Sequence, residues 1–336
     1  MNPDMLDPVR PRRFLTACPA YAVSPLRRHS LDGRSFWIKD ETGRMGLGAF
    51  KALGGVYAVA ALIGTAACVA DEPENLLRDD VRARAADMTF VCASAGNHGM
   101  AVAAGAKLFG ARCRIHLSAT VPAGFAKRLR AKGADVVRSG ETYEESVAAA
   151  IADAAETGAV HLADGSWPQY TEPPRLVMEG YTVIAEELRQ SFEITGEWPS
   201  RVYLQAGVGG LAAAMAFMIR RNWTVQPEIV VVEPDAAPCL AESVKAGKII
   251  TVEGPVSNMG RLDCKTPSML ALEILTVTAD RYVTVTDNEA AEAAHRADGL
   301  GVPTTPSGAA GLAALLREPA GPGEALVILS EGAVAA

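Results

Sequence analysis

The sequence contains no C-x-x-C pair, because its six cysteines lie far apart along 336 residues. This absence disfavours a zinc ribbon, a redox dithiol and a disulfide scaffold, and it favours reduced thiols. Basic residues are not in excess either: 32 Lys and Arg stand against 39 Asp and Glu and leave a net charge of -7, which disfavours nucleic acid as a partner. Residues 1–4 lack the basic and apolar segments of a secretory signal, so we expect a cytoplasmic protein.

One uncharged stretch, residues 52–70 between Lys51 and Asp71, has the length of a membrane span. It consists mostly of Ala, Gly, Val and Thr, and acidic residues and a proline follow it directly. A bilayer-spanning helix would be richer in Leu, Ile and Phe. We therefore expect a helix that is buried inside a folded domain, and no membrane partner.

Apolar residues make up 49% of the chain, and strand-like segments alternate with helix-like segments. The predicted strands are residues 35–39, 88–92, 113–117, 135–138, 202–205, 228–232 and 326–329, and the predicted helices are 122–132, 142–155, 180–192, 212–220, residues 100–109 and one that begins near Ala49. Continuous apolar strands between helices are typical of parallel sheets covered on both faces. The pattern predicts an α/β protein, with Pro173-Pro174 as the clearest break between its parts.

The segment from Asp40 to Lys51 is a glycine-punctuated loop that brings a single lysine to the start of an apolar helix. The helix dipole and apolar neighbours would lower the pKa of Lys51. A neutral, nucleophilic amine is what Schiff-base chemistry on a carbonyl requires. The alternative is a surface lysine at a helix start.

A second polar loop, Ser94 to Gly99, follows a predicted strand and precedes a predicted helix. Its small residues let backbone amides approach an anion, and Asn97 can donate or accept a hydrogen bond. A substrate carboxylate or a phenolic oxygen could bind there. The alternative is an ordinary turn that caps the helix.

A third segment, Gly207 to Ala212, reads as G-x-G-x-x-A, and Glu233 ends the next predicted strand. This pattern imitates a dinucleotide-binding fingerprint, in which an acidic residue contacts the ribose. The same strand, loop and helix start would equally hold a single phosphate group. The motif alone leaves both ligands open.

Together these segments resemble the fold type II pyridoxal-phosphate enzymes, the superfamily of tryptophan synthase β and threonine dehydratase. Within it the sequence is most similar to the diaminopropionate ammonia-lyases, which carry a run like residues 44–51 followed by a glycine pair like Gly54-Gly55. The similarity continues at residues 164–170, 178–181, 204–209, 232–235, 264–267 and 273–275.

The resemblance implies two open parallel-sheet domains with the active site between them. Residues 1–60 and 176–336 would form a large domain that binds pyridoxal 5'-phosphate, and residues 61–175 a small one. It also implies a homodimer and a small amino-acid substrate. No catalytic metal is inferred, because the histidines show no ligand spacing.

The resemblance also assigns roles to individual residues. Lys51 would carry the cofactor as a Schiff base and move the α-proton, and Asp164 would act as an acid or base near the substrate. The predicted cofactor contacts are Asn97 on the 3-oxygen, Gly207, Val208, Gly209 and Gly210 on the phosphate, and Ser330 on the pyridine nitrogen. The predicted substrate contacts are Ser94, Ala95, Gly96 and His98.

The sequence departs from the family's pattern at several positions. Ala95 stands where the family usually has a second aspartate, which puts use of both substrate enantiomers in doubt. Gly48 replaces the family's asparagine, and the chain ends soon after Ser330. Lys265 replaces a small residue, and Arg261 lies close by. Two added cations near the substrate loop suggest a substrate with an anionic or large side chain. The alternative is that both cations are exposed to solvent and contact no substrate.

The predicted reaction is α,β-elimination on a small β-substituted amino acid, with 2,3-diaminopropionate converted to pyruvate and ammonia. Alternatives that keep the cofactor are a serine, threonine or 3-hydroxyaspartate dehydratase and a β-replacement synthase. Two alternatives belong to other functional classes. One is a nicotinamide-dependent oxidoreductase that binds its cofactor at the Gly207 loop, but this function would give Lys51 and Asn97 no role. The other is a binding module without catalytic activity.

Overall fold

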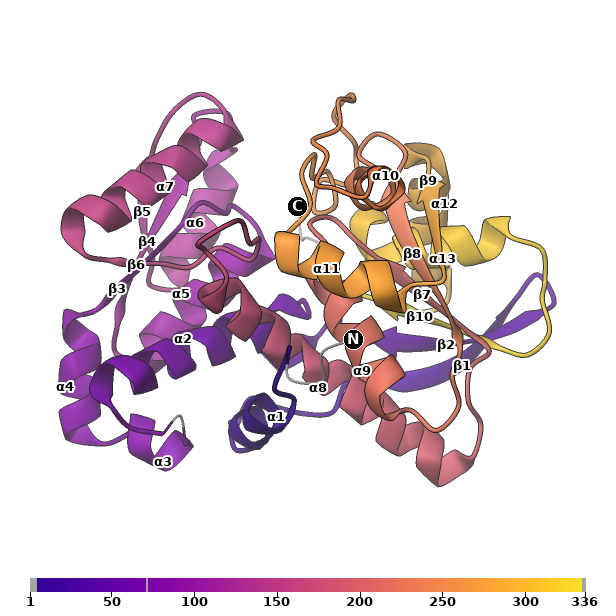
Figure 1. Cartoon of the computed structure of the whole chain (residues 1–336), viewed down its shortest axis with the longest axis horizontal. Coiled ribbons are helices and arrows are strands. Elements are labelled where there is room, and N and C mark those ends of the chain that lie inside the picture. The colour runs from indigo at the N-terminus through magenta and orange to yellow at the C-terminus, as the bar shows by residue number, and fades with distance from the viewer. Residues whose placement is uncertain (1–4, 71, 334–336) are drawn as a thin grey trace.

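The computed structural model describes residues 5–70 and 72–333, which form two sheets with helices packed on their faces. Figure 1 shows the smaller sheet at the left and the larger one at the right. This confirms the predicted α/β class with two open parallel-sheet parts. The exact domain boundaries, after residues 60 and 175, stay a prediction.

The larger sheet combines the two ends of the chain. Its strands lie in the order β1 (Leu26–Leu31), β2 (Arg34–Asp40), β10 (Ala325–Leu329), β7 (Arg201–Gln205), β8 (Glu228–Pro234) and β9 (Arg281–Val285). Strands β2, β10, β7, β8 and β9 are parallel to one another. The helices in the same two parts of the chain are α1 (Val9–Thr16), α8 (Glu172–Thr195), α9 (Gly210–Asn222), α10 (Cys239–Ala246), α11 (Met269–Thr278), α12 (Asp287–Gly299) and α13 (Pro306–Arg317).

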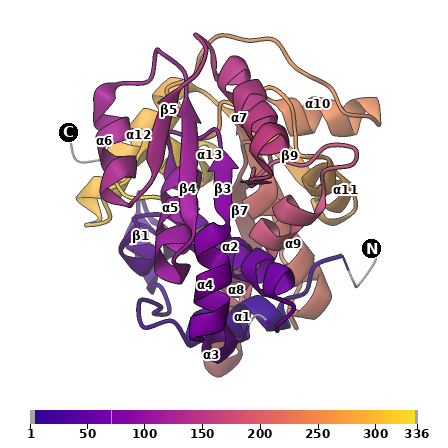
Figure 2. The ribbon, with the colours of Figure 1, turned by 90° about the vertical axis from the view of Figure 1, so that its left-hand side faces the viewer.

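The smaller sheet is parallel throughout and faces the viewer in Figure 2. Its strands lie in the order β5 (Asp135–Arg138), β4 (Arg112–Leu117), β3 (Thr89–Cys92) and β6 (Val160–His161). The helices of this part of the chain are α2 (Lys51–Ala67), α3 (Pro73–Leu76), α4 (Asp79–Asp87), α5 (Asn97–Phe109), α6 (Ala123–Ala131) and α7 (Tyr143–Thr157).

Several features differ from the sequence prediction. Among the described residues, strands β1, β6 and β9 and helices α1, α3, α4, α10, α11 and α12 were not predicted. Strand β1 runs antiparallel to β2 at the sheet edge. Its sequence is polar and mostly exposed, so it carries no apolar signal. Pro173-Pro174 is not a break: both prolines lie in the first turn of α8, which starts eight residues before the predicted Gly180. Proline is tolerated there because first-turn amides have no partner within the helix.

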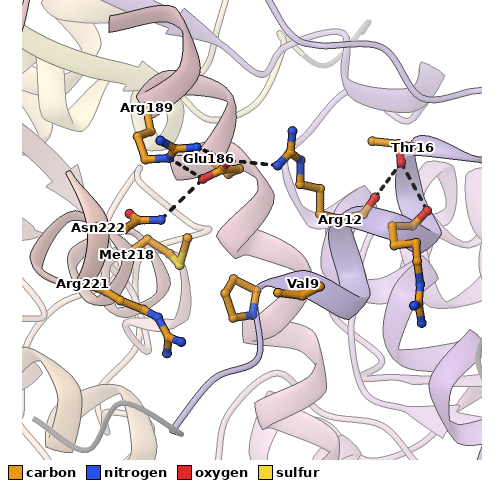
Figure 3. A pocket seen from close by; sticks show the side chains of 10 residues that line it. Val9, Arg12, Thr16, Glu186, Arg189, Met218, Arg221 and Asn222 are labelled. Carbon is orange, nitrogen blue, oxygen red and sulfur yellow. Dashed lines mark hydrogen bonds and ion pairs between the residues drawn. The ribbon is translucent and has the colours of Figure 1, made fainter. Parts of the chain in front are cut away.

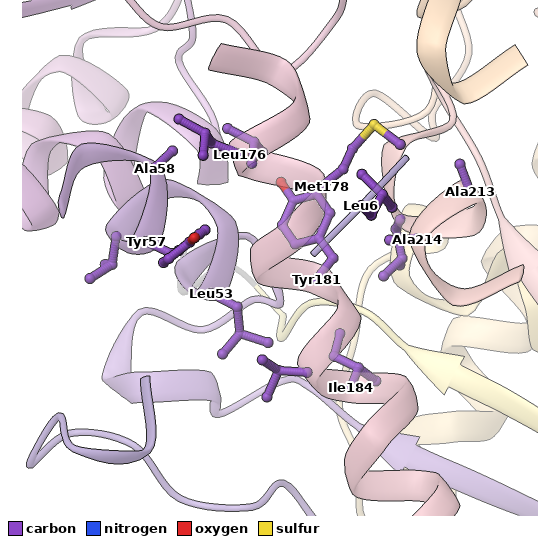
Figure 4. Close-up of a cluster of buried hydrophobic side chains, with 14 of the residues drawn as sticks. Leu6, Leu53, Tyr57, Ala58, Leu176, Met178, Tyr181, Ile184, Ala213 and Ala214 are labelled. Carbon is purple, nitrogen blue, oxygen red and sulfur yellow. The ribbon is translucent and has the colours of Figure 1, made fainter. Parts of the chain in front are cut away.

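Helix α2 is buried along most of its length and packs between α5 and α8. Figure 4 shows Leu53 and Tyr57 of α2 close to Tyr181 and Ile184 of α8. Glycines permit this close packing: a Cβ on Gly180 would lie 2.6 Å from the Cα of Gly54. Among the helices of the described residues, none combines the length and low polarity that a bilayer crossing needs.

A buried ion network lies under the loop that leads to Lys51. Arg44 donates to Glu41 at 2.6 and 2.7 Å and to Glu187 of α8 at 2.9 Å through two nitrogens. Lys39 of β2 donates to Glu187 at 2.5 Å. All four side chains are at most 4% exposed. The network therefore ties the loop before Lys51 to α8, and it balances each buried charge with an opposite one.

Candidate active site

Lys51 begins α2 and forms an ion pair with Asp164, which follows β6 of the smaller sheet. The lysine Nζ lies 2.5 Å from Asp164 Oδ2, and the two side chains are 19% and 26% exposed. Burial by itself would lower the pKa of Lys51, but the Asp164 carboxylate outweighs burial and raises it above the usual value. Burial would raise the pKa of Asp164, and Lys51 holds it below its usual value instead.

The expectation of a lowered pKa for Lys51 is therefore wrong. It rested on the helix dipole and on the apolar residues near Lys51 in the sequence. The carboxylate that decides the pKa stands 113 residues later, so only the tertiary structure brings it to the amine. A close opposite charge has a larger effect than the dipole of a helix end.

Aromatic rings form one wall beside Lys51. The rings of Phe50 and Tyr181 meet edge to face with centroids 4.8 Å apart, and the lysine Nζ lies 6.0 Å from the Tyr181 centroid. The Tyr181 hydroxyl is buried and has no hydrogen-bond partner among the described residues. The backbone N–H of Phe50 donates to the carbonyl of Ser330 at 3.1 Å, which ties the start of α2 to the end of β10.

Asn97 starts α5, and its side-chain amide donates to Glu331, the second residue after β10. The other oxygen of Glu331 accepts a hydrogen bond from Thr305 at 2.6 Å, so the carboxylate is fixed on both sides. The Asn97 amide has two hydrogens, and one remains for a further acceptor. Glu331 had no predicted role, although its place after the last strand of a parallel sheet is where ligand-binding residues gather.

Ser94 to His98 lie together at the start of α5, which begins at Asn97 and not at the predicted Met100, and they face different surroundings. The backbone N–H of Gly96 donates to Ser94 Oγ at 3.3 Å, and Gly96 caps α5 without a side-chain hydrogen bond. Ala95 is half-buried. His98 is 3% exposed, its Nε2 pairs with the carbonyl of Leu162 at 2.8 Å, and burial lowers its pKa. His98 is thus mainly anchored inside the protein, and its contact with a substrate stays a prediction.

The Gly207–Gly210 loop connects β7 to α9 and has little room for side chains at Gly207 and Gly209. A Cβ on Gly207 would lie 3.0 Å from Cys264 Sγ, and Gly209 has a positive φ of 100° that favours glycine. No side chain caps α9, so the amides of its first turn are left for an anion.

Glu233 is occupied by the protein itself. One carboxylate oxygen accepts the N–H of Leu240 at 2.7 Å and the other accepts the N–H of Ala241 at 2.8 Å, at the start of α10. The side chain is fully buried. A dinucleotide fingerprint needs this acid on a ribose, so the Gly207 loop is better suited to a single phosphate group.

A pocket of about 610 Å³ lies elsewhere, between α1, α8 and α9 (Figure 3). Arg12 and Arg189 line it, and both pair with Glu186. Its arginines lie on α1, α8 and α9, and Gly210 of α9 is the one predicted site residue on these helices. We therefore assign the chemistry to the Lys51 region rather than to this pocket.

Comparison with known proteins identifies the family. A family model described as pyridoxal-phosphate dependent enzyme matches residues 18–331. The chain belongs to this family. Its cofactor is pyridoxal phosphate, as the sequence resemblance indicated.

The similar proteins include diaminopropionate ammonia-lyases. Those of Escherichia coli K12 and Salmonella typhimurium LT2 are each 32% identical, over 261 and 292 residues, covering 76% and 83% of this chain. The matches cover 64% and 72% of those proteins, so this chain spans less than two thirds of the E. coli relative. A structure of the E. coli ammonia-lyase with an aminoacrylate–cofactor azomethine intermediate has a TM-score of 0.83 and 26% identity, covering 99% of this chain and 93% of that one.

The residues present fit pyridoxal phosphate. The glycine-rich Gly207–Gly210 loop at the start of α9 would hold its phosphate, and Lys51 offers the amine for its aldehyde. Asn97 has a free amide hydrogen for the 3-oxygen. Ser330 directly follows β10 and is 4% exposed; its contact with the pyridine nitrogen stays a prediction.

Proposed function

We propose that this pyridoxal-phosphate-dependent enzyme catalyses α,β-elimination on a small amino acid with an amine on Cβ. For 2,3-diaminopropionate, one water would be consumed and pyruvate and two ammonia released. The observation that carries the proposal is the 2.5 Å contact between Lys51 Nζ and Asp164 Oδ2. Elimination needs a group that takes the α-proton and a group that guides a proton to the leaving group, and this pair places an amine and a carboxylate together for those two tasks.

The bound cofactor would accept the electron pair that is left when the α-proton is removed. Lys51 Nζ would take that proton. Asp164, whose carboxylate faces the lysine, would then guide a proton to the leaving amine. Asn97 and Glu331 would hold the cofactor ring in place, and the amides at the start of α5 would bind the substrate carboxylate. Ser94, Ala95, Gly96 and His98 are the proposed lining of that part of the site.

The comparisons support elimination rather than the other classes. The E. coli ammonia-lyase structure contains an aminoacrylate intermediate, which is the species that β-elimination produces. A nicotinamide-dependent reaction would need Glu233 on a ribose, and both Glu233 oxygens already accept backbone N–H groups. Because the matched region covers 64% of the E. coli relative, the substrate of this chain is our proposal.

The test is product stoichiometry across a substrate panel. Purified enzyme would be given 2,3-diaminopropionate, serine and threonine as separate D and L enantiomers, and ammonia and 2-oxo acid would be counted. We expect two ammonia per pyruvate from diaminopropionate, the highest kcat/KM for that substrate, and a strong preference for one enantiomer because Ala95 carries no carboxylate. Serine or threonine as the best substrate would indicate a dehydratase. Capture of the product by an added thiol at the expense of pyruvate would indicate a β-replacement synthase.

We further propose a cytoplasmic homodimer. All six cysteines are free thiols, as in proteins of reducing compartments, and the dimer rests on the resemblance to the family. Light scattering on the eluting enzyme should give twice the monomer mass of 35.2 kDa. A single-chain mass at micromolar concentration would contradict the dimer.

A further inference from the structure

Arg261 reaches the active site from the loop between α10 and α11, and its backbone is held in place. The Arg261 N–H donates to Ser307 Oγ at 3.1 Å, and Ser307 is buried in the first turn of α13. The Arg261 carbonyl oxygen lies 3.1 Å from the position that a Cβ on Gly207 would occupy. The base of the side chain therefore lies directly beside the phosphate-binding loop.

The guanidinium extends from there to the start of α5. Its Nη1 lies 2.8 Å from the position of a Cβ on Gly96, so the missing side chain at Gly96 makes room for it. Its central carbon also lies 5.6 Å from the centroid of Phe125 on α6. Arg261 thus connects the larger sheet to the predicted substrate loop.

The guanidinium still has donors to offer. Its nearest carboxylate is Glu331, whose Oε2 lies 3.7 Å from Nε, too far for a hydrogen bond, and Glu331 is already bonded to Asn97 and Thr305. Within residues 5–70 and 72–333, the Arg261 side chain donates no hydrogen bond, and it is 27% exposed.

Lys265, the other extra cation, differs from Arg261 in this respect. Its amine contacts Asp263 at 2.6 Å and donates to the carbonyls of Ala236 and Pro255 at 2.8 and 2.9 Å. An ammonium has three hydrogens, so these contacts use its donor capacity. Only Arg261 of the two presents unused donors to a ligand.

Two groups that attract anions therefore lie side by side, the uncapped start of α5 and the Arg261 guanidinium. The α-carboxylate of an amino acid needs only one of them. We propose, on the basis of the proposed elimination activity, that Arg261 recognises a second carboxylate on the substrate side chain. The substrate class is then the acidic β-substituted amino acids, such as 2,3-diaminosuccinate or 3-hydroxyaspartate. A planar guanidinium binds a carboxylate through two parallel hydrogen bonds, which gives orientation as well as affinity.

The test uses substrate pairs that differ by one carboxylate: diaminosuccinate with diaminopropionate, and 3-hydroxyaspartate with serine. Wild-type enzyme should have the higher kcat/KM for the dicarboxylic member of each pair. Arg261→Gln should reduce that preference by about 10- to 100-fold, the usual cost of losing a charged hydrogen-bonded pair. Lys265→Gln, the matched control, should leave the preference unchanged.

A binding measurement separates this inference from the proposed reaction. Aspartate and alanine have no β-leaving group, and their binding can be followed by the change in the visible absorption of the holoenzyme. Arg261→Gln should weaken aspartate binding about tenfold more than alanine binding even if no substrate is eliminated. Should Arg261→Gln fold poorly, Arg261→Lys replaces it and should keep part of the preference.

If Arg261→Gln lowered kcat/KM equally for both members of each substrate pair, the proposal would be overturned, because Arg261 would then bind the α-carboxylate or stabilise the fold. An equal loss in Lys265→Gln would overturn it as well. Preference for aspartate over alanine with no elimination from any substrate would keep the Arg261 assignment and reject the proposed reaction.

Discussion

Lys39 and Lys51 stand twelve positions apart, and each has a carboxylate oxygen 2.5 Å from its amine, yet they differ in almost everything else. Lys39 is 1% exposed, and its amine also donates to the carbonyl of Ser24 at 2.8 Å. Burial lowers the pKa of Lys39 in spite of Glu187, whereas Asp164 raises the pKa of Lys51 in spite of burial.

A search for a lysine with a lowered pKa would therefore select Lys39, which no ligand can reach. The partly open pair is the one suited to chemistry, because its single partner can be exchanged for a ligand. The closed network is suited to holding the loop in position, because every charge has a fixed partner. Access to the amine and exchangeable partners thus identify the reactive lysine better than the direction of its pKa shift.

The largest expected effect separates the two lysines directly. Lys51→Ala should abolish the covalent link to the cofactor and lower the elimination rate by at least about 10³-fold. Borohydride reduction followed by peptide mapping should label Lys51 in the wild type and leave the variant unlabelled. Full turnover by Lys51→Ala, or a label on Lys39, would reverse our assignment of the two roles.

Lys39→Met should instead cost stability, about 3–5 kcal/mol, because it leaves Glu187 with one buried cation fewer. The denaturant midpoint measures this loss. The exposed Lys248→Met is a matched control and should change stability by about 0.5 kcal/mol or less. A stable Lys39→Met enzyme that fails to bind cofactor would mean that Lys39, too, belongs to the active site.

Asp164→Asn should have opposite effects on two steps. Without the carboxylate, burial would dominate and lower the pKa of Lys51. At pH 7.5 the apoenzyme should therefore form its Schiff base with added pyridoxal phosphate faster, by about tenfold for each unit by which the pKa falls. Turnover should fall by about 10²-fold or more, because the carboxylate that guides a proton to the leaving amine is lost. The exposed Asp135→Asn is the control for both rates. Slower cofactor attachment in Asp164→Asn would contradict the assigned cause of the raised pKa.

The comparison extends to the carboxyl groups, where Asp164 and Glu233 differ in the same way. Glu233 has no cationic partner among the described residues, and burial raises its pKa to about 7. Since this folded-state pKa exceeds the unfolded value of about 4.3, the group's contribution to stability is complete below that value and is lost as pH rises through 7. Glu179 behaves alike, with a pKa that burial raises to about 7.

The wild type should accordingly lose up to about 3 kcal/mol per group between pH 5 and 8. Glu233→Gln, which cannot ionise, should have a flatter dependence of the thermal midpoint on pH over this range. Glu253→Gln, at an exposed position, is the control and should keep the wild-type slope. Identical slopes in all three proteins would show that Glu233 does not titrate in this range.

The parts of the site that the sequence predicted are those with a local pattern. Lys51 begins an apolar helix, Asn97 follows a strand in a small polar loop, and the Gly207 loop precedes α9. The contacts that orient these residues come from distant parts of the chain and have no local signal: Glu331 binds Asn97 across 234 positions, and Glu187 binds Arg44 across 143. The direction of the Lys51 pKa shift was missed for this reason.

The sequence also left two readings open that packing resolves. Arg261 and Lys265 looked equivalent as added cations, and only their partners distinguish them, because Lys265 is saturated and Arg261 is not. Glu233 fitted a dinucleotide fingerprint until both its oxygens were found to cap α10. A sequence motif specifies only the spacing between residues, whereas the availability of a side chain for a ligand depends on which other groups already contact it.

The amino-acid sequence by itself determined the alternation of strands and helices and the loops that can approach an anion, because each depends on residues within one short segment. It indicated the cofactor class through a resemblance to a family that extends over most of the chain. The tertiary structure decided which charges meet. It brought Asp164 to Lys51, closed Lys39 inside a network and placed Arg261 against Gly96. Such electrostatic effects depend on distance and burial in space, and neither is encoded in the spacing along the chain.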